Sequence, residues 1–177
     1  GHTTGHYLSA LALACCCGEQ EAAFLKKVDY LVAGLAECQD AMAKSGKFHP
    51  GFLSGYSEEQ FDLLEEYTYY PKIWAPYYTL HKIMAGLLDC YELAGSKPAL
   101  AVCEKLGMWV YHRLHACGEE KRQKMWSLYI AGEFGGMNEV MARLYGPSLS
   151  RIPLWSRRRT TLSRYRWSPA HDTQNRT

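Results

Sequence analysis

The chain has 177 residues, of which 47% are hydrophobic and 21% are charged, with a net charge of +2. This composition is typical of a globular protein and excludes a largely disordered one. No apolar run reaches the roughly 18 residues that a membrane span needs, so we expect no membrane partner and leave the localisation unknown.

The first 57 residues predict two helices and a loop. Apolar residues occupy nearly every position of 5–17, which indicates a largely buried helix that Gly18 ends. Apolar residues three and four apart, with charges between them, predict an amphipathic helix over 19–44. Gly, Ser, Pro and aromatic residues fill 46–57, so we expect an ordered loop there.

The next segment predicts a short helix and an aromatic loop. Ser57 and Gln60 have the spacing of a capping box, which predicts that Ser57 caps a helix over 58–67. Pro71 and Pro76 prevent regular helix in the aromatic segment that follows.

Two long helices are then expected to form an antiparallel hairpin. Pro76 fits the first turn of a helix over 77–94, and Gly95 ends it. Ser96 is the expected N-cap of a helix over 97–117. Two further helices are predicted over 119–129 and 135–145.

These elements predict an all-α fold. No segment alternates apolar and polar residues with the period of a strand. Densely apolar helices (5–17, 77–94) alternate with amphipathic ones (19–44, 97–117). The inner and outer helices of a toroid of antiparallel helical hairpins would alternate in this way.

His2 and His6 stand four residues apart and would share one face of a helix. Three interpretations are open: a metal site, core packing or capping, and the lining of a pocket. A zincin motif needs a Glu beside the first His, where this chain has Thr3, and no third ligand is in reach along the sequence. Metal is therefore the least favoured interpretation.

The seven cysteines form neither a CxxC pair nor a disulfide framework, so we interpret them as small buried hydrophobic residues. Cys15, Cys16 and Cys17 would point about 100° apart on a helix and could not converge on one ion.

Two further stretches suggest a sugar site. Six aromatic residues between Tyr67 and Tyr78 could stack on sugar rings, although packing inside an interface is equally plausible. In "GEFGGMNE", Glu133 and Glu139 could form the acid/base couple of a glycosidase, whereas helix capping is the simpler account of Asn138 and Glu139.

Five motifs together resemble one family. In order along the chain they are "GHTTGHYLSALA", "DYLVAGLAECQDA", "GFLSGYSEEQFDLLE", "WAPYYTLHKIMAGLLDCYELAG" and "EFGGMNEVMARLY". They resemble the N-terminal part of the catalytic domain of glycoside hydrolase family 127 and its relative family 146, the β-L-arabinofuranosidase group. The resemblance covers residues 1–146.

The resemblance implies part of an (α/α)6 barrel, incomplete in this chain, from a retaining glycosidase. Such an enzyme would remove terminal β-L-arabinofuranosyl groups from plant glycans, with a zinc-held cysteine as nucleophile and a glutamate as acid/base. This chain has no counterpart of the zinc and nucleophile motifs, so we expect no catalytic residue, no bound metal and no cofactor in it. The resemblance implies a substrate-binding set comprising His2, His6, Trp74, Tyr77, His81, Glu133, Asn138 and Glu139.

The C-terminal segment differs from the rest of the chain. Residues 151–177 contain seven Arg and one Asp and no helical period. We therefore expect two parts: a catalytic-domain fragment over 1–146, cut from a larger protein, and an Arg-rich tail over 147–177 that is disordered or translated out of frame. A basic nucleic-acid-binding arm is the less favoured alternative, and we expect no nucleic-acid partner.

The expected partner is a carbohydrate substrate, with self-association through exposed inner helices. This chain is expected to be inactive as an enzyme. The alternative functions are a non-catalytic carbohydrate-binding module and a helical interaction module.

Overall fold

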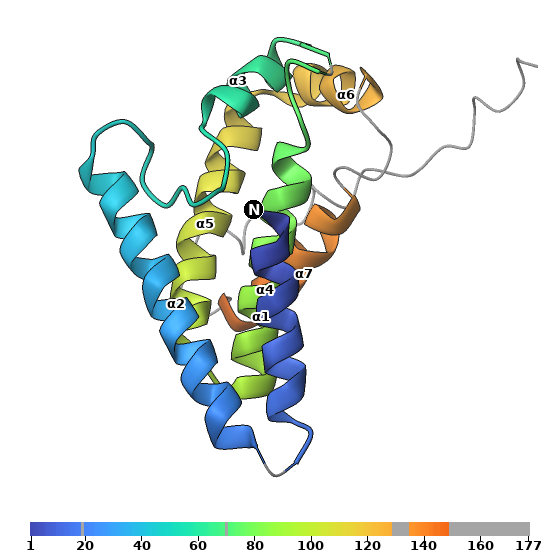
Figure 1. The fold of residues 1–177 in the computed structure, drawn as a ribbon. Coiled ribbons are helices and arrows are strands. Elements are labelled where there is room, and N and C mark those ends of the chain that lie inside the picture. The colour runs from blue at the N-terminus through green and yellow to red at the C-terminus, as the bar shows by residue number, and fades with distance from the viewer. Residues whose placement is uncertain (19, 70, 129–134, 149–177) are drawn as a thin grey trace, which may run out of the picture.

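The computed structural model describes residues 1–18, 20–69, 71–128 and 135–148. These residues form seven helices and no strand, so the predicted all-α class is confirmed for the described chain (Figure 1). The helices are α1 (His2–Cys15), α2 (Glu21–Lys44), α3 (Glu59–Glu65), α4 (Pro76–Ala94), α5 (Lys97–Ala116), α6 (Glu119–Leu128) and α7 (Gly135–Ser148).

Three helices run side by side in the same direction. Two contacts show that α1 and α4 are parallel. Gly1 lies against Thr79, and further along both helices the Cys90 thiol donates to the carbonyl of Leu8. Along α4 and α7, His81 lies against Gly136 and Asp89 pairs with Arg143. Parallel inner helices of this kind are what part of an (α/α)6 toroid requires. In Figure 1, α1 is drawn in front of α4.

The predicted hairpin of α4 and α5 is confirmed. Gly95 adopts the left-handed conformation with φ 69°, which lets the chain reverse after α4. The backbone N–H of Ser96 then donates to the carbonyl of Cys90. Further back along α4, the Cys103 thiol of α5 lies 3.8 Å from the carbonyl of Met84, so the two helices are antiparallel.

Glycines allow α1 and α4 to approach closely. A Cβ on Gly86 would lie 2.5 Å from the carbonyl oxygen of Gly5 and 2.8 Å from the Cβ of Leu8. A Cβ on Gly5 would lie 2.7 Å from the backbone nitrogen of Ile83 and closer still to the carbonyl of Lys82. Neither position has room for a side chain, so the two backbones pack directly on each other.

The predicted capping box is wrong. The structure has no side-chain cap at the start of α3, which begins at Glu59. The Gln60 side chain instead accepts from the backbone N–H of Trp74, at 3.1 Å, and donates to the carbonyl of Lys72. A local spacing could not reveal that a loop 12 to 14 residues away competes for this amide.

The start of α1 also differs from the prediction. The helix begins at His2 rather than residue 5, so His2 and His6 both belong to it. At the start of α5, Ser96 occupies the predicted N-cap position, but its side chain makes no capping hydrogen bond.

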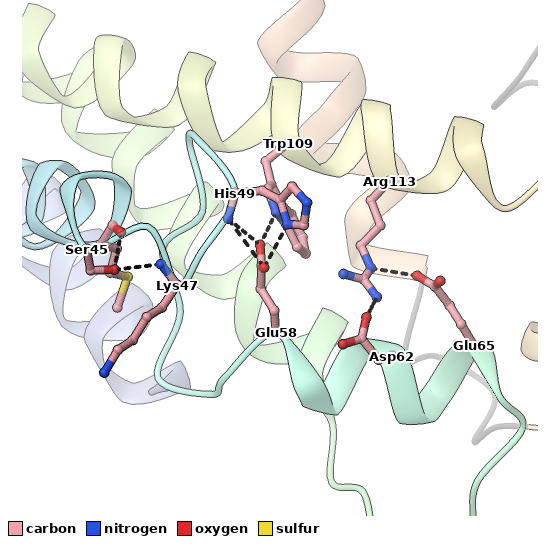
Figure 2. A network of polar contacts seen from close by, with 9 residues as sticks. Ser45, Lys47, His49, Glu58, Asp62, Glu65, Trp109 and Arg113 are labelled. Atoms are coloured by element: carbon pink, nitrogen blue, oxygen red, sulfur yellow. Dashed lines mark hydrogen bonds and ion pairs between the residues drawn. The ribbon is translucent and has the colours of Figure 1, made fainter.

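A polar network ties the loop before α3 to α5 (Figure 2). The buried carboxylate of Glu58 accepts from the indole N–H of Trp109 at 2.6 Å and from the backbone N–H of His49 at 3.2 Å. The His49 ring nitrogen Nδ1 lies 2.9 Å from the same carboxylate. Arg113 of α5 adds ion pairs with Asp62 and Glu65. Glu58 therefore holds its loop to α5 from a buried position.

The cysteines are only partly the buried residues that the sequence predicts. Cys15, Cys90 and Cys103 are buried, but Cys16, Cys17 and Cys38 are exposed, which corrects the prediction for those three. Cys16 and Cys17 follow the last residue of α1, and Cys38 lies on α2. All seven described thiols are free.

None of the described helices combines the length and apolar character that crossing a bilayer requires. The expected division of the chain after residue 146 stays a prediction. The last turn of α7 runs through Pro147 to Ser148, and residues 149–177 of the expected tail lie outside the described residues.

Candidate functional site

Four rings meet near the N-terminal ends of α1 and α4, and we call them the histidine group: His2, His6, Tyr78 and His81. The ring centroids of His2 and His6 lie 5.9 Å apart, and those of His2 and Tyr78 lie 6.0 Å apart. The Tyr78 and His81 centroids are 5.0 Å apart with nearly perpendicular planes. The parallel packing of α1 and α4 brings these rings together.

The histidine group runs from solvent into the interior. His2 and His6 are exposed, Tyr78 is half-buried, and His81 retains only 6% of its accessible surface. The ammonium of Lys82 lies 5.3 Å from the centroid of the Tyr78 ring, which adds a cation–π contact at the edge of the group.

His81 is held as a neutral ring. Burial lowers the pKa of His81, and the nearby charge of Lys82 lowers it further. The carbonyl of Tyr77 and the carboxylate of Glu139 act in the opposite direction, and His6 adds a smaller lowering effect. The ring nitrogen Nδ1 is buried and has no partner with full hydrogen-bond geometry among the described residues, so the interaction with the Tyr77 carbonyl is a weak one. A neutral imidazole can both donate and accept a hydrogen bond.

The start of α7 contributes two of the predicted residues. Asn138 is half-buried, and Glu139 is exposed, with a carboxylate oxygen 3.8 Å from Arg143. The negative charge of Glu139 opposes the lowering of the pKa of His81 by burial, which links the "GGMNE" stretch to the histidine group. Glu133 lies outside the described residues, so the expected carboxylate couple stays a prediction.

Trp74 and Tyr77 have separate surroundings. Trp74 is exposed in the loop just before α4. Tyr77 is fully buried in an aromatic core, with ring centroids 4.9 Å from Phe61 and 5.1 Å from Trp126. Burial raises the pKa of Tyr77 above its ordinary value. The structure thus places Tyr77 in the core and its neighbour Tyr78 in the histidine group.

Tyr78 was among the aromatic residues predicted to be able to stack on sugar rings, but it was absent from the substrate-binding set that the resemblance implies. Successive residues of a helix point about 100° apart, so Tyr77 and Tyr78 cannot share one environment. Tyr78 and His81 are three apart on α4, and Tyr78 and Lys82 are four apart. That helical spacing is the signal that could have found Tyr78.

The comparison with protein families agrees with this arrangement of helices. The model of the β-L-arabinofuranosidase, GH127 catalytic domain matches residues 1–170. The chain belongs to this family. The match runs beyond residue 146, where the resemblance among the sequence motifs ends. A comparison with curated proteins found no match.

The described part of this GH127 domain does not fit the zinc ion implied for the family. Among residues 1–18, 20–69, 71–128 and 135–148, no three His, Cys, Asp or Glu side chains are grouped so that they could hold a metal. We therefore derive no chemistry through zinc from these residues.

Two thiols of the GH127 domain, the buried Cys90 and the half-buried Cys117, are poor nucleophiles. Burial raises the pKa of Cys90 to about 12, and the nearby Asp89 adds to this effect. Burial raises the pKa of Cys117 to about 11, with a further contribution from Glu65. These raised pKa values keep both thiols protonated near neutral pH. The thiolate is the reactive form, so neither side chain is a ready nucleophile.

Proposed function

We propose that the histidine group forms part of the sugar-binding wall of a glycosidase of the β-L-arabinofuranosidase type. The observation that supports this most directly is the convergence of His2, His6, Tyr78 and His81 from two parallel helices. The proposed ligand is the terminal β-L-arabinofuranosyl group of a plant glycan.

The chemistry of the group suits a neutral sugar. Aromatic faces stack on sugar C–H groups, while ring nitrogens and phenol oxygens exchange hydrogen bonds with hydroxyls. His2 and His6 are accessible from solvent, and His81 offers a neutral ring behind them. Trp74, Asn138 and Glu139 remain proposed contacts at the same ends of α4 and α7, whereas Tyr77 would act by supporting α4 from the core.

We also propose that the chain binds sugar without hydrolysing it. A retaining glycosidase needs a nucleophile and a general acid on opposite sides of the anomeric carbon. The described thiols of Cys90 and Cys117 are held protonated, and Glu139 is exposed and placed beside Arg143. In the retaining mechanism expected of the family, the nucleophile and the general acid would be residues other than Cys90, Cys117 and Glu139.

Titration with L-arabinose, followed by NMR, tests the binding proposal. We expect saturable binding at millimolar strength, or about 4 kcal/mol. His81→Ala should weaken it, whereas His112→Ala, which removes an exposed histidine of α5, should leave it unchanged. Equal binding by both variants, or no saturation at all, would contradict the proposal.

An assay with an aryl β-L-arabinofuranoside tests for hydrolysis. We expect no turnover above the buffer blank, with or without added Zn²⁺. Turnover by the purified chain that Glu133→Gln or Glu139→Gln abolishes would assign a catalytic role to the "GEFGGMNE" segment and overturn the proposal.

A further inference from the structure

Gly136, the second residue of α7, lies against the His81 ring. A Cβ built on Gly136 would be 2.9 Å from Cε1 of His81 and closer still to Nε2 and Cδ2. These three ring atoms are its nearest neighbours, and Cβ atoms essentially never come within 3.0 Å of another group. Any side chain at position 136 would therefore displace the His81 ring.

The adjacent glycine is free of this constraint. A Cβ on Gly135 would have nothing within 4 Å among the described residues. Neither Gly135 nor Gly136 is among the described glycines with positive φ, so the backbone conformation does not require glycine at either position. The contact with His81 is what distinguishes Gly136 from Gly135.

The His81 ring has little freedom to retreat within the interior. The side chain is buried, and the Tyr78 ring meets it nearly perpendicularly at 5.0 Å. Close packing of α1 on α4 at Gly5 and Gly86 fixes the backbone on the neighbouring turns. A ring displaced by a methyl group at position 136 would have to rotate away from α7, because protein interiors contain few voids of that size.

We infer that Gly136 is a positioning residue that holds the His81 ring in the histidine group by leaving room for it against α7. This inference concerns the ring itself, and its consequence for sugar binding rests on the function proposed above. Gly136 acts through His81 and is not assigned a contact with the substrate.

The matched pair Gly136→Ala and Gly135→Ala tests the inference. The two substitutions add the same methyl group at successive positions of one helix turn. The readout is the His81 ring signal in long-range ¹H–¹⁵N NMR spectra, followed through a pH titration of the whole chain.

In the native chain, burial and Lys82 lower the pKa of His81, with Glu139 and the Tyr77 carbonyl opposing them and His6 adding to the lowering. We expect Gly135→Ala to leave the titration midpoint of His81 unchanged. Gly136→Ala should raise it toward the ordinary histidine value, because the displaced ring moves toward water. The same midpoint in both variants would overturn the inference.

A double variant decides the outcome if Gly136→Ala does not fold. His81→Ala removes the ring whose atoms occupy the space, so His81→Ala/Gly136→Ala should fold as well as His81→Ala alone. A double variant that remains unfolded would show that another contact excludes the methyl group, and the inference would fail.

L-Arabinose binding separates this inference from the proposed function. Loss of binding in Gly136→Ala, with binding retained in Gly135→Ala, supports both. If no variant binds the sugar but Gly136→Ala still shifts the His81 titration, the proposed function fails and the positioning role stands.

Discussion

His81 places an ionisable ring in the interior between α4 and α7. The ring is accommodated there because it is neutral and because α7 begins with glycines. Its buried Nδ1 has no partner with full hydrogen-bond geometry among the described residues, although the backbone carbonyl of Tyr77, one turn earlier on α4, acts on the ring.

Protonation of His81 should destabilise the fold. Burial lowers the pKa of His81 from its ordinary value of 6.5, so the unfolded chain binds this proton more readily than the folded chain. The stability that the neutral ring provides is complete above about pH 6.5 and is lost as the pH falls toward the lower folded pKa. Melting temperatures measured at about pH 7.5 and about pH 5.5 should therefore differ less for His81→Gln than for the native chain. An equal fall in melting temperature between the two pH values in both proteins would contradict this expectation. His112→Gln, at an exposed histidine, is the control and should behave like the native chain.

Glu58 should contribute more to stability than its neighbour Glu59. Glu58→Gln would turn an amide N–H₂ toward one of the donors that its carboxylate now accepts from, namely Trp109 or His49. We expect a loss of about 1–3 kcal/mol in the free energy of unfolding, measured with urea. Glu59 is exposed, so Glu59→Gln should change the free energy of unfolding by less than about 0.5 kcal/mol. Equal effects of the two substitutions would show that the Glu58 network adds no stability.

Among the helices, α1 and α4 depend on their glycines for close packing. Each glycine faces backbone atoms of the other helix, so a methyl group at either position would push the helix axes apart. The same contact aligns His2 and His6 with Tyr78 and His81, because it fixes the register of α1 along α4. Packing and the geometry of the histidine group are thus properties of one helix pair.

Gly5→Ala should be destabilising although alanine is the better helix former. The methyl group would overlap the carbonyl of Lys82, which cannot rotate away as a side chain could, and we expect a loss of about 1–3 kcal/mol. Gly34 of α2 has nothing within 4 Å of a Cβ among the described residues, so Gly34→Ala should stabilise the chain by about 0.5–1 kcal/mol. Urea unfolding of both variants checks the contrast, and a stabilising Gly5→Ala would contradict the described helix contact.

At the scale of the whole molecule, α1 presents an uncharged face to solvent. The helix contains no Asp, Glu, Lys or Arg, and its Tyr7 and Leu13 are 48% and 57% exposed. Apolar helix faces of this kind associate with other surfaces in water. This feature supports the expected self-association, which stays a prediction.

Tyr7→Ser should reduce self-association of the purified chain. Sedimentation velocity at several protein concentrations measures the effect. The matched control is Tyr30→Ser on α2, where the same side chain is 80% exposed but lies on a helix with many charged residues. A monomer at all concentrations, or equal effects of the two substitutions, would contradict a role for α1.

The sequence by itself determined the all-α class, the approximate position of every described helix, and membership of the GH127 family. Helical periodicity, proline at helix starts and glycine at helix ends act over a few residues, so they can be recognised without the fold. His2, His6 and His81 were also predicted to belong together, through the family motifs. The structure places these side chains near the N-terminal ends of α1 and α4, and their role in substrate binding stays a proposal.

Only the tertiary structure decided which neighbours those residues have. Tyr78 joins the histidine group and Tyr77 enters the core, because the orientation of α4 against α1 and α3 divides two adjacent tyrosines between different environments. Gln60 binds the loop before α4 rather than the start of its own helix. Gly136 leaves space for the ring of His81, which lies 55 residues earlier in the chain. Contacts of this kind depend on the register between helices, which the packing of whole helix faces sets and which no local pattern encodes.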